Sequence, residues 1–85
     1  MTKVQYPVDQ KILESIYPGK RAKTSQRAKN GLVRTYQYAE SVVLISSKKG
    51  EILLKTFLAN AKFTFKYELR MQEMEKHLVC IITQS

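Results

Sequence analysis

The side chains of this sequence that are best suited to binding a ligand are the cations of one segment. Residues 15–39 contain six Lys and Arg side chains and no Asp or Glu, whereas the 85-residue chain has 15 basic and 7 acidic side chains and a net charge of +8. The segment cations are Lys20, Arg21, Lys23, Arg27, Lys29 and Arg34. Because clustered cations displace counterions from a polyanion, this segment predicts binding to the phosphates of a nucleic acid.

The spacing of these cations suits an extended polyanion. The triplet Arg-Ala-Lys occurs at 21–23 and again at 27–29. In an extended chain the two triplets lie ~20 Å apart, which spans several phosphates of a strand. The competing interpretation is a solvated surface loop, which is how most runs of charge are used. The absence of any acid in the segment favours phosphate binding.

Two aromatic side chains follow the segment closely. Tyr36 and Tyr38 come after Arg34 with strand spacing, so all three would share one face of a strand. Tyrosines beside cations on a sheet can stack on unpaired bases, which favours RNA or single-stranded DNA over a duplex. The alternative is that these tyrosines belong to the core and keep their hydroxyl groups at its rim.

The sequence offers little for catalysis. His77 is the one histidine, and Glu73 and Glu75 precede it, but an exposed histidine at a strand edge is the favoured interpretation. Cys80 lies in the apolar run 78–82 and is expected in the core. The chain has neither metal-ligand spacing nor a glycine-rich phosphate loop. We therefore expect no catalytic residue, no metal and no cofactor.

Two other functions remain open. One is a protein-binding inhibitor or adaptor of viral or plasmid type, acting as a homodimer or on another protein, because Leu53, Leu54, Phe57 and Leu58 would place apolar groups on both faces of a strand. The other is a ribonuclease. Small basic α+β ribonucleases of the toxin type resemble this chain in size, charge and gross element order, but no motif aligns and no residue takes a role from them.

The elements that position these residues must fit one small basic domain, residues 1–85. The longest apolar runs are far shorter than the ~20 residues that a bilayer-spanning helix needs. No apolar segment follows Lys3, so no secretory signal is expected. A single cysteine cannot form an internal disulfide. These features predict a reducing cytosol, that of a host or of an infected cell.

The first third of the chain predicts one helix. Residues 2–6 alternate as an edge strand would, up to Pro7. A helix is expected over 9–17, with Asp9 as its N-cap and Pro18-Gly19 at its end, because Ile12, Leu13, Ile16 and Tyr17 form one apolar stripe. The basic stretch 19–31 has too few apolar side chains to dock on a core. We expect a loop or a solvent-facing helix there.

The rest of the chain predicts strands. Residues 32–39 and 41–47 have β-like patterns. Lys48-Lys49-Gly50 then suggests a hairpin turn, with Gly50 at positive φ, before a strand over 51–58. A helix over 51–61 is the competing prediction, because the same leucines and Phe57 also fit helical spacing.

The C-terminal pattern is the clearest of the sequence. Phe63, Phe65, Tyr67, Leu69 and Met71 alternate with polar residues, so one face of a strand should be buried. Residues 72–76 would turn the chain, and 77–83 would form an inner strand of the sheet. We expect this hairpin to be the stability core. The predicted fold is α+β: a short N-terminal helix, a basic excursion, and an antiparallel β-meander of about four strands.

Overall fold

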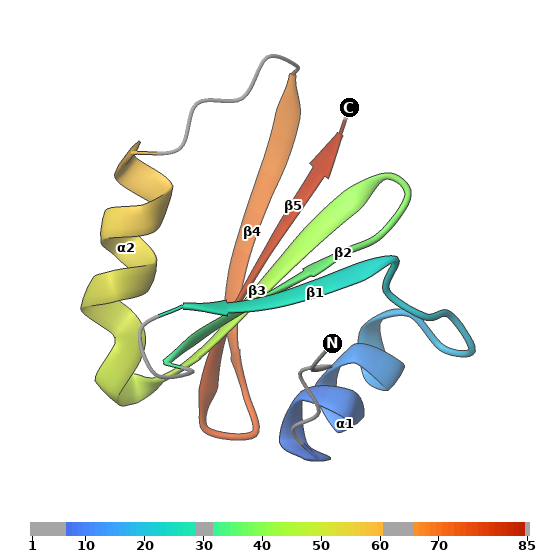
Figure 1. Ribbon diagram of the computed structural model, residues 1–85, viewed down its shortest axis with the longest axis horizontal. Coiled ribbons are helices and arrows are strands. Elements are labelled where there is room, and N and C mark those ends of the chain that lie inside the picture. The colour runs from blue at the N-terminus through green and yellow to red at the C-terminus, as the bar shows by residue number, and fades with distance from the viewer. Residues whose placement is uncertain (1–6, 29–31, 61–65, 85) are drawn as a thin grey trace.

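The computed structural model describes residues 7–28, 32–60 and 66–84. One antiparallel sheet with the strand order β1-β2-β3-β5-β4 forms its centre (Figure 1). The elements in chain order are α1 (Pro7–Ile16), β1 (Thr24–Ala28), β2 (Val33–Gln37), β3 (Ser41–Ser47), η1 (Lys48–Gly50), α2 (Glu51–Asn60), β4 (Tyr67–Met74) and β5 (His77–Gln84). The α+β prediction is confirmed, but the sheet has five strands and a second helix is inserted between β3 and β4.

Helix α1 confirms the helix predicted over 9–17. It begins at Pro7, where the missing N–H costs nothing because the first-turn amides have no partner within a helix. The amide of Tyr17 still donates to the carbonyl of Leu13 (2.8 Å). Gly19 then takes a left-handed φ of 73°, which a residue with a side chain rarely adopts. The helix therefore ends where Pro18-Gly19 predicted.

The prediction of a loop or helix throughout 19–31 is wrong, because residues 24–28 form the edge strand β1. This strand pairs with β2 from Thr24 opposite Gln37 to Ala28 opposite Val33. A strand at an edge is held by backbone hydrogen bonds along one side, so it needs no apolar face. The amide of Lys23 also donates to the carbonyl of Gln37 (2.6 Å).

The hairpin predicted at Lys48-Lys49-Gly50 is wrong, and the competing helix is correct. The 3₁₀ turn η1 leads directly into α2, where Lys55 and Glu51 form an ion pair one turn apart (3.1 Å). Gly50 does not take a positive φ. It is required because a Cβ there would lie 2.6 Å from the carbonyl oxygen of Leu32. The glycine thus allows two backbone segments to approach each other.

The two helices lie on opposite faces of the sheet (Figure 1). Strands β3 and β5 are at its centre and supply buried side chains to both faces. This confirms the strand predicted over 41–47 and the inner strand predicted over 77–83. The buried apolar cluster on the α1 face contains Ile12, Tyr36, Tyr38, Val43, Ile45, Val79 and Ile81. The cluster on the α2 face contains Val33, Leu44, Leu54, Cys80 and Ile82.

The C-terminal hairpin is confirmed, but its predicted buried face is wrong. Strand β4 pairs with β5 and continues to Met74, and Glu75 and Lys76 turn the chain with φ of 50° and 64°. Tyr67, Leu69 and Met71 retain 44%, 46% and 37% of their exposure. They line the outer strand, while the buried cluster on this side gathers over β3 and β5. The stability core therefore lies on β3 and β5.

Some sequence predictions lie outside the described residues. These are the edge strand over 2–6, the burial of Phe63 and Phe65, and the role of Lys29. Within the described ranges, neither helix has the length and apolar character that crossing a membrane requires.

Candidate nucleic-acid interface

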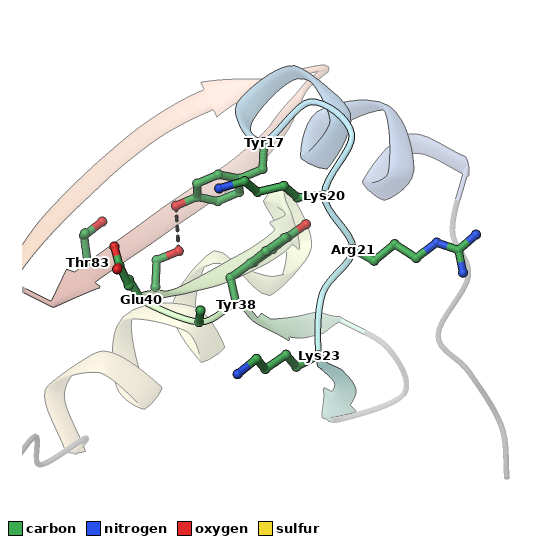
Figure 2. A pocket seen from close by; sticks show the side chains of 9 residues that line it. Tyr17, Lys20, Arg21, Lys23, Tyr38, Glu40 and Thr83 are labelled. Carbon is green, nitrogen blue, oxygen red and sulfur yellow. Dashed lines mark hydrogen bonds between the residues drawn. The ribbon is translucent and has the colours of Figure 1, made fainter.

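A pocket of about 450 Å³ opens where three separate parts of the chain meet. They are the loop between α1 and β1, the turn between β2 and β3, and the end of β5 (Figure 2). The lining residues are Tyr17, Lys20, Arg21, Lys23, Tyr38, Ala39, Glu40, Ser41 and Thr83. The pocket thus lies at one end of the sheet, beside the first half of the basic segment.

Hydrogen bonds and ring packing hold the basic loop over this pocket. The hydroxyl groups of Tyr17 and Ser41 are hydrogen-bonded to each other (2.6 Å), and the rings of Tyr17 and Tyr38 pack with their centroids 4.5 Å apart (Figure 2). At the other end of the loop, the amide of Lys23 is bonded to Gln37. Because both ends of the loop are anchored, its cations are carried on a defined backbone.

Three of the predicted cations come together at this pocket. Lys20, Arg21 and Lys23 line it and are exposed, and Glu40 is the one acid among the lining residues. Figure 2 shows the guanidinium group of Arg21 pointing outward, away from the two tyrosines. Arg27 is exposed farther along, on β1. Lys20, Arg21 and Lys23 thus give this end of the molecule a positive surface that a polyanion can approach from solvent.

Of the other two predicted cations, one is buried and one falls outside the described residues. Lys29 lies outside the described residues. Arg34 is buried, and its Nε and Nη2 groups donate to the two carboxylate oxygens of Asp9 (2.8 and 2.7 Å). Asp9 therefore does not act as the predicted N-cap: it lies within the first turn of α1 and is completely buried. A bidentate pair of this kind joins the helix to the sheet.

The two tyrosines predicted to stack on bases are part of the core. Tyr36 and Tyr38 retain 4% and 8% of their exposure, so neither ring face is open as a platform. The Tyr36 hydroxyl donates to Oδ2 of Asp9, and burial, with this bond, raises the pKa of Tyr36. Burial also raises the pKa of Tyr38. Tyr38 still lines the pocket wall, which places it next to any ligand there.

The remaining reactive side chains do not assemble around the pocket. The Nδ1–H of His77 donates to the backbone carbonyl of Glu75 (2.8 Å). The carboxylates of Glu73 and Glu75 form ion pairs with Lys48 and Lys11, respectively (3.8 and 3.4 Å). Cys80 is buried, and burial raises the pKa of its thiol to about 11. Among the residues that the structure describes, no three His, Cys, Asp or Glu side chains gather as metal ligands would.

Sequence reasoning missed several pocket residues. Tyr17 was assigned to the apolar stripe of α1, and Glu40, Ser41 and Thr83 were assigned no role. The register of the sheet is the signal that brings them together, because Ser41 lies opposite Thr83 in the β3–β5 pair. That register is a long-range property, and local spacing does not reveal it.

No protein-family model matches this chain, and no curated protein or solved structure matches it.

Proposed function

We propose that the protein is a small, non-catalytic module that binds RNA or single-stranded DNA in the cytosol. The observation that carries this proposal is the placement of Lys20, Arg21 and Lys23 around one pocket whose lining contains a single acid. Phosphate contacts from such cations supply most of the affinity of sequence-independent binding. The free, buried thiol of Cys80 fits a reducing compartment.

Two features favour a single strand over a duplex. The exposed cations lie on a loop and an edge strand, whereas duplex readout usually inserts a helix into the major groove. A pocket of about 450 Å³ also falls within the range of small-ligand sites, ~300–1,000 Å³. It has room for a sugar-phosphate unit or a splayed base, which single strands provide. The walls formed by Tyr17 and Tyr38 would contact that unit.

The number of exposed cations sets the expected salt dependence. Lys20, Arg21 and Lys23 line the pocket and are exposed, whereas Arg34 is bonded to Asp9 inside the protein. Three contacts at about −0.7 each give a slope of roughly −2 for log K against log salt on a single strand. Fluorescence anisotropy with a labelled oligouridylate, its DNA counterpart and a duplex measures that slope.

A charge-matched pair of variants tests where binding occurs. Lys20→Glu with Lys23→Glu should lower the affinity at low salt by at least about a hundredfold, because two phosphate contacts become repulsions. The control, Lys49→Glu with Lys76→Glu, changes the net charge by the same amount at exposed positions outside the pocket lining. It should retain most of the affinity. Equal losses in both variants, or no binding by the native chain at low salt, would contradict the proposal.

The same preparation tests the ribonuclease alternative. Cleavage of the labelled RNA by the native chain, lost in the Lys20→Glu and Lys23→Glu variant, would replace the binding module with an enzyme that uses the same cations. His77→Ala should change neither binding nor RNA integrity, because His77 bonds only to the backbone of the β4–β5 turn among the described contacts.

A second candidate function is the protein-binding inhibitor or adaptor. The observation that favours it is a set of exposed apolar side chains on α2 and β4: Ile52, Phe57, Tyr67, Leu69 and Met71. Tyr67, Leu69 and Met71 lie on one face of β4, and exposed apolar groups that lie together are typical of protein interfaces. If the native chain binds no polyanion at low salt, the inhibitor or adaptor function becomes the favoured proposal.

A further inference from the structure

Strand β4 is the last strand of the described sheet, and several of its apolar side chains are partly exposed. Its outer edge has no neighbouring strand among the described residues, because the order of the sheet finishes at β5-β4. Tyr67, Leu69 and Met71 point to the α2 side of the sheet, since they lie opposite the inward-facing residues of β5 on that side. All three are more than one-third exposed. An edge with an apolar face is a template for another strand.

The sequence of β4 is complementary to itself when two copies run antiparallel. If Leu69 lies opposite Leu69 of a second copy, then Glu68 lies opposite Arg70 and Tyr67 lies opposite Met71. Residues directly opposite in an antiparallel pair share a face, so the charged pairs lie on one face and the apolar pairs on the other. Symmetry forms each of the unlike pairs twice.

Neighbouring registers lack this match. A shift of one residue would place polar residues opposite apolar ones on both faces. A shift of the pairing centre to Arg70 brings two arginines face to face, and a shift to Glu68 brings two glutamates face to face. Like charges directly opposite each other destabilise a strand pair. Charge complementarity therefore selects the register centred on Leu69.

The opposite edge of the sheet, formed by β1, is not complementary to itself in this way. The outer strand there is β1, whose charged residue is Arg27, with Lys23 and Arg21 just before it and no acid within the strand. Two copies joined through β1 would bring these cations together. Positive charge of this kind protects an edge from pairing with itself.

We infer that a second copy of this chain pairs antiparallel with β4 through its outer edge, in the register centred on Leu69. The two five-stranded sheets then form one continuous sheet with a two-fold axis at Leu69. This contact covers Tyr67, Leu69 and Met71 and places the two β1 strands at opposite ends. The inference goes beyond the proposed nucleic-acid binding, and it is tested without nucleic acid.

Charge exchange between the strands tests the register directly. Sedimentation equilibrium of the native chain should show twice the 9.9 kDa of one copy. Glu68→Arg alone, or Arg70→Glu alone, should weaken the dimer about tenfold or more, because each places like charges opposite each other twice. Because both side chains are exposed, each variant should still fold as a monomer, which a cooperative thermal unfolding transition would show.

Mixing the two variants provides the decisive readout. One strand then carries two cations and the other two anions, so both cross-strand pairs become attractive again and a heterodimer should form. A double variant with Glu68→Arg and Arg70→Glu should likewise recover the native affinity. A native chain that stays monomeric at high micromolar concentration, or a dimer unaffected by either single variant, would overturn the inference. A monomer would leave this face to a different protein, as the adaptor alternative requires.

Discussion

The two helices are equal in length, but they are held on the sheet in different ways. Helix α1 packs on the apolar cluster through Ile12 and is fixed in addition by a charged cluster, because Asp9 accepts hydrogen bonds from Arg34 and Tyr36 inside the protein. Helix α2 is held through Leu54 in an apolar cluster, and its other side exposes Ile52 and Phe57. Directional bonds fix a position and an angle, whereas apolar contact is non-directional. The directional bonds of α1 therefore give the loop that follows it a defined position.

The difference extends to the two outer strands of the sheet, β1 and β4. On the α1 side, the anchored helix leads into the loop with Lys20, Arg21 and Lys23 and then into β1. On the α2 side, the helix covers the centre of the sheet and leaves β4 exposed. The region of β1 and the loop before it thus presents charge to solvent, and β4 presents apolar surface. These are the surfaces that we assign to a polyanion and to a second copy.

The largest expected effect comes from breaking the charged anchor of α1. Asp9→Ala leaves the buried guanidinium of Arg34 without its carboxylate, and losing one partner of a buried ion pair typically costs about 3–5 kcal/mol. Total stability for a small domain is about 5–15 kcal/mol, so much of it would be lost. Urea unfolding followed by circular dichroism measures the change.

A compensating variant separates the buried charge from simple loss of packing. Asp9→Leu with Arg34→Met and Tyr36→Phe replaces the whole cluster by apolar groups of similar volume. Such replacements are often neutral, so this variant should recover most of the stability that Asp9→Ala loses. A cost below about 1 kcal/mol for Asp9→Ala would show that the ion pair does not anchor the helix.

The next effect tests the apolar attachment of α2. Leu54 is fully buried, and truncation of a buried leucine to alanine costs about 2–5 kcal/mol through lost burial and the cavity that remains. Ile52, two residues earlier, keeps 78% of its exposure. Ile52→Ala should cost under about 0.5 kcal/mol, because alanine also favours the helix. Equal costs in urea unfolding would mean that α2 does not pack through Leu54.

The sequence correctly predicted the elements whose hydrophobic pattern fits only one type of secondary structure. The stripe of α1 and the β-branched run of β3 satisfy only a helix and only a strand, respectively. Residues 51–60 were ambiguous because two pairs of adjacent apolar residues, at 53–54 and 57–58, fit both patterns. The close approach of Gly50 to Leu32 is a tertiary contact, and it explains the glycine without a hairpin turn.

The candidate site was only partly predictable for a similar reason. Clustering of Lys20, Arg21 and Lys23 is visible in the sequence because they are neighbours. The role of Arg34 is not, since its partner Asp9 is 25 residues away and was assigned to a helix cap. Its strand phase gave a hint: Arg34 shares a face with Tyr36, so it had to be buried if the tyrosine was. Whether β4 is covered depends on where α2 packs, which no local pattern contains.

The smallest expected effect is a change of stability with pH that comes from Cys80, whose thiol is buried on the α2 face. Burial raises the pKa of Cys80 from 9.0 to about 11, so ionisation of this thiol favours the unfolded chain. The stabilising contribution of the neutral thiol is complete below pH 9 and is lost as the pH rises toward about 11. Cys80→Ala lacks this titration. The stability difference between the native chain and the variant should therefore be constant near neutral pH and shrink over that alkaline window.

Two tyrosines on the α1 face also affect stability at alkaline pH. Burial raises the pKa of Tyr36 and of Tyr38 above 10.0, so their ionisation also destabilises the fold at alkaline pH, in the native chain and in Cys80→Ala alike. The contribution of the tyrosines cancels in the difference between the two proteins, and the contribution of Cys80 remains. Urea midpoints measured from neutral pH to about 11 give that difference. A difference that stays constant across the range would mean that the α2 face admits a thiolate, and that its apolar cluster is more open to water than the fully buried Cys80 indicates.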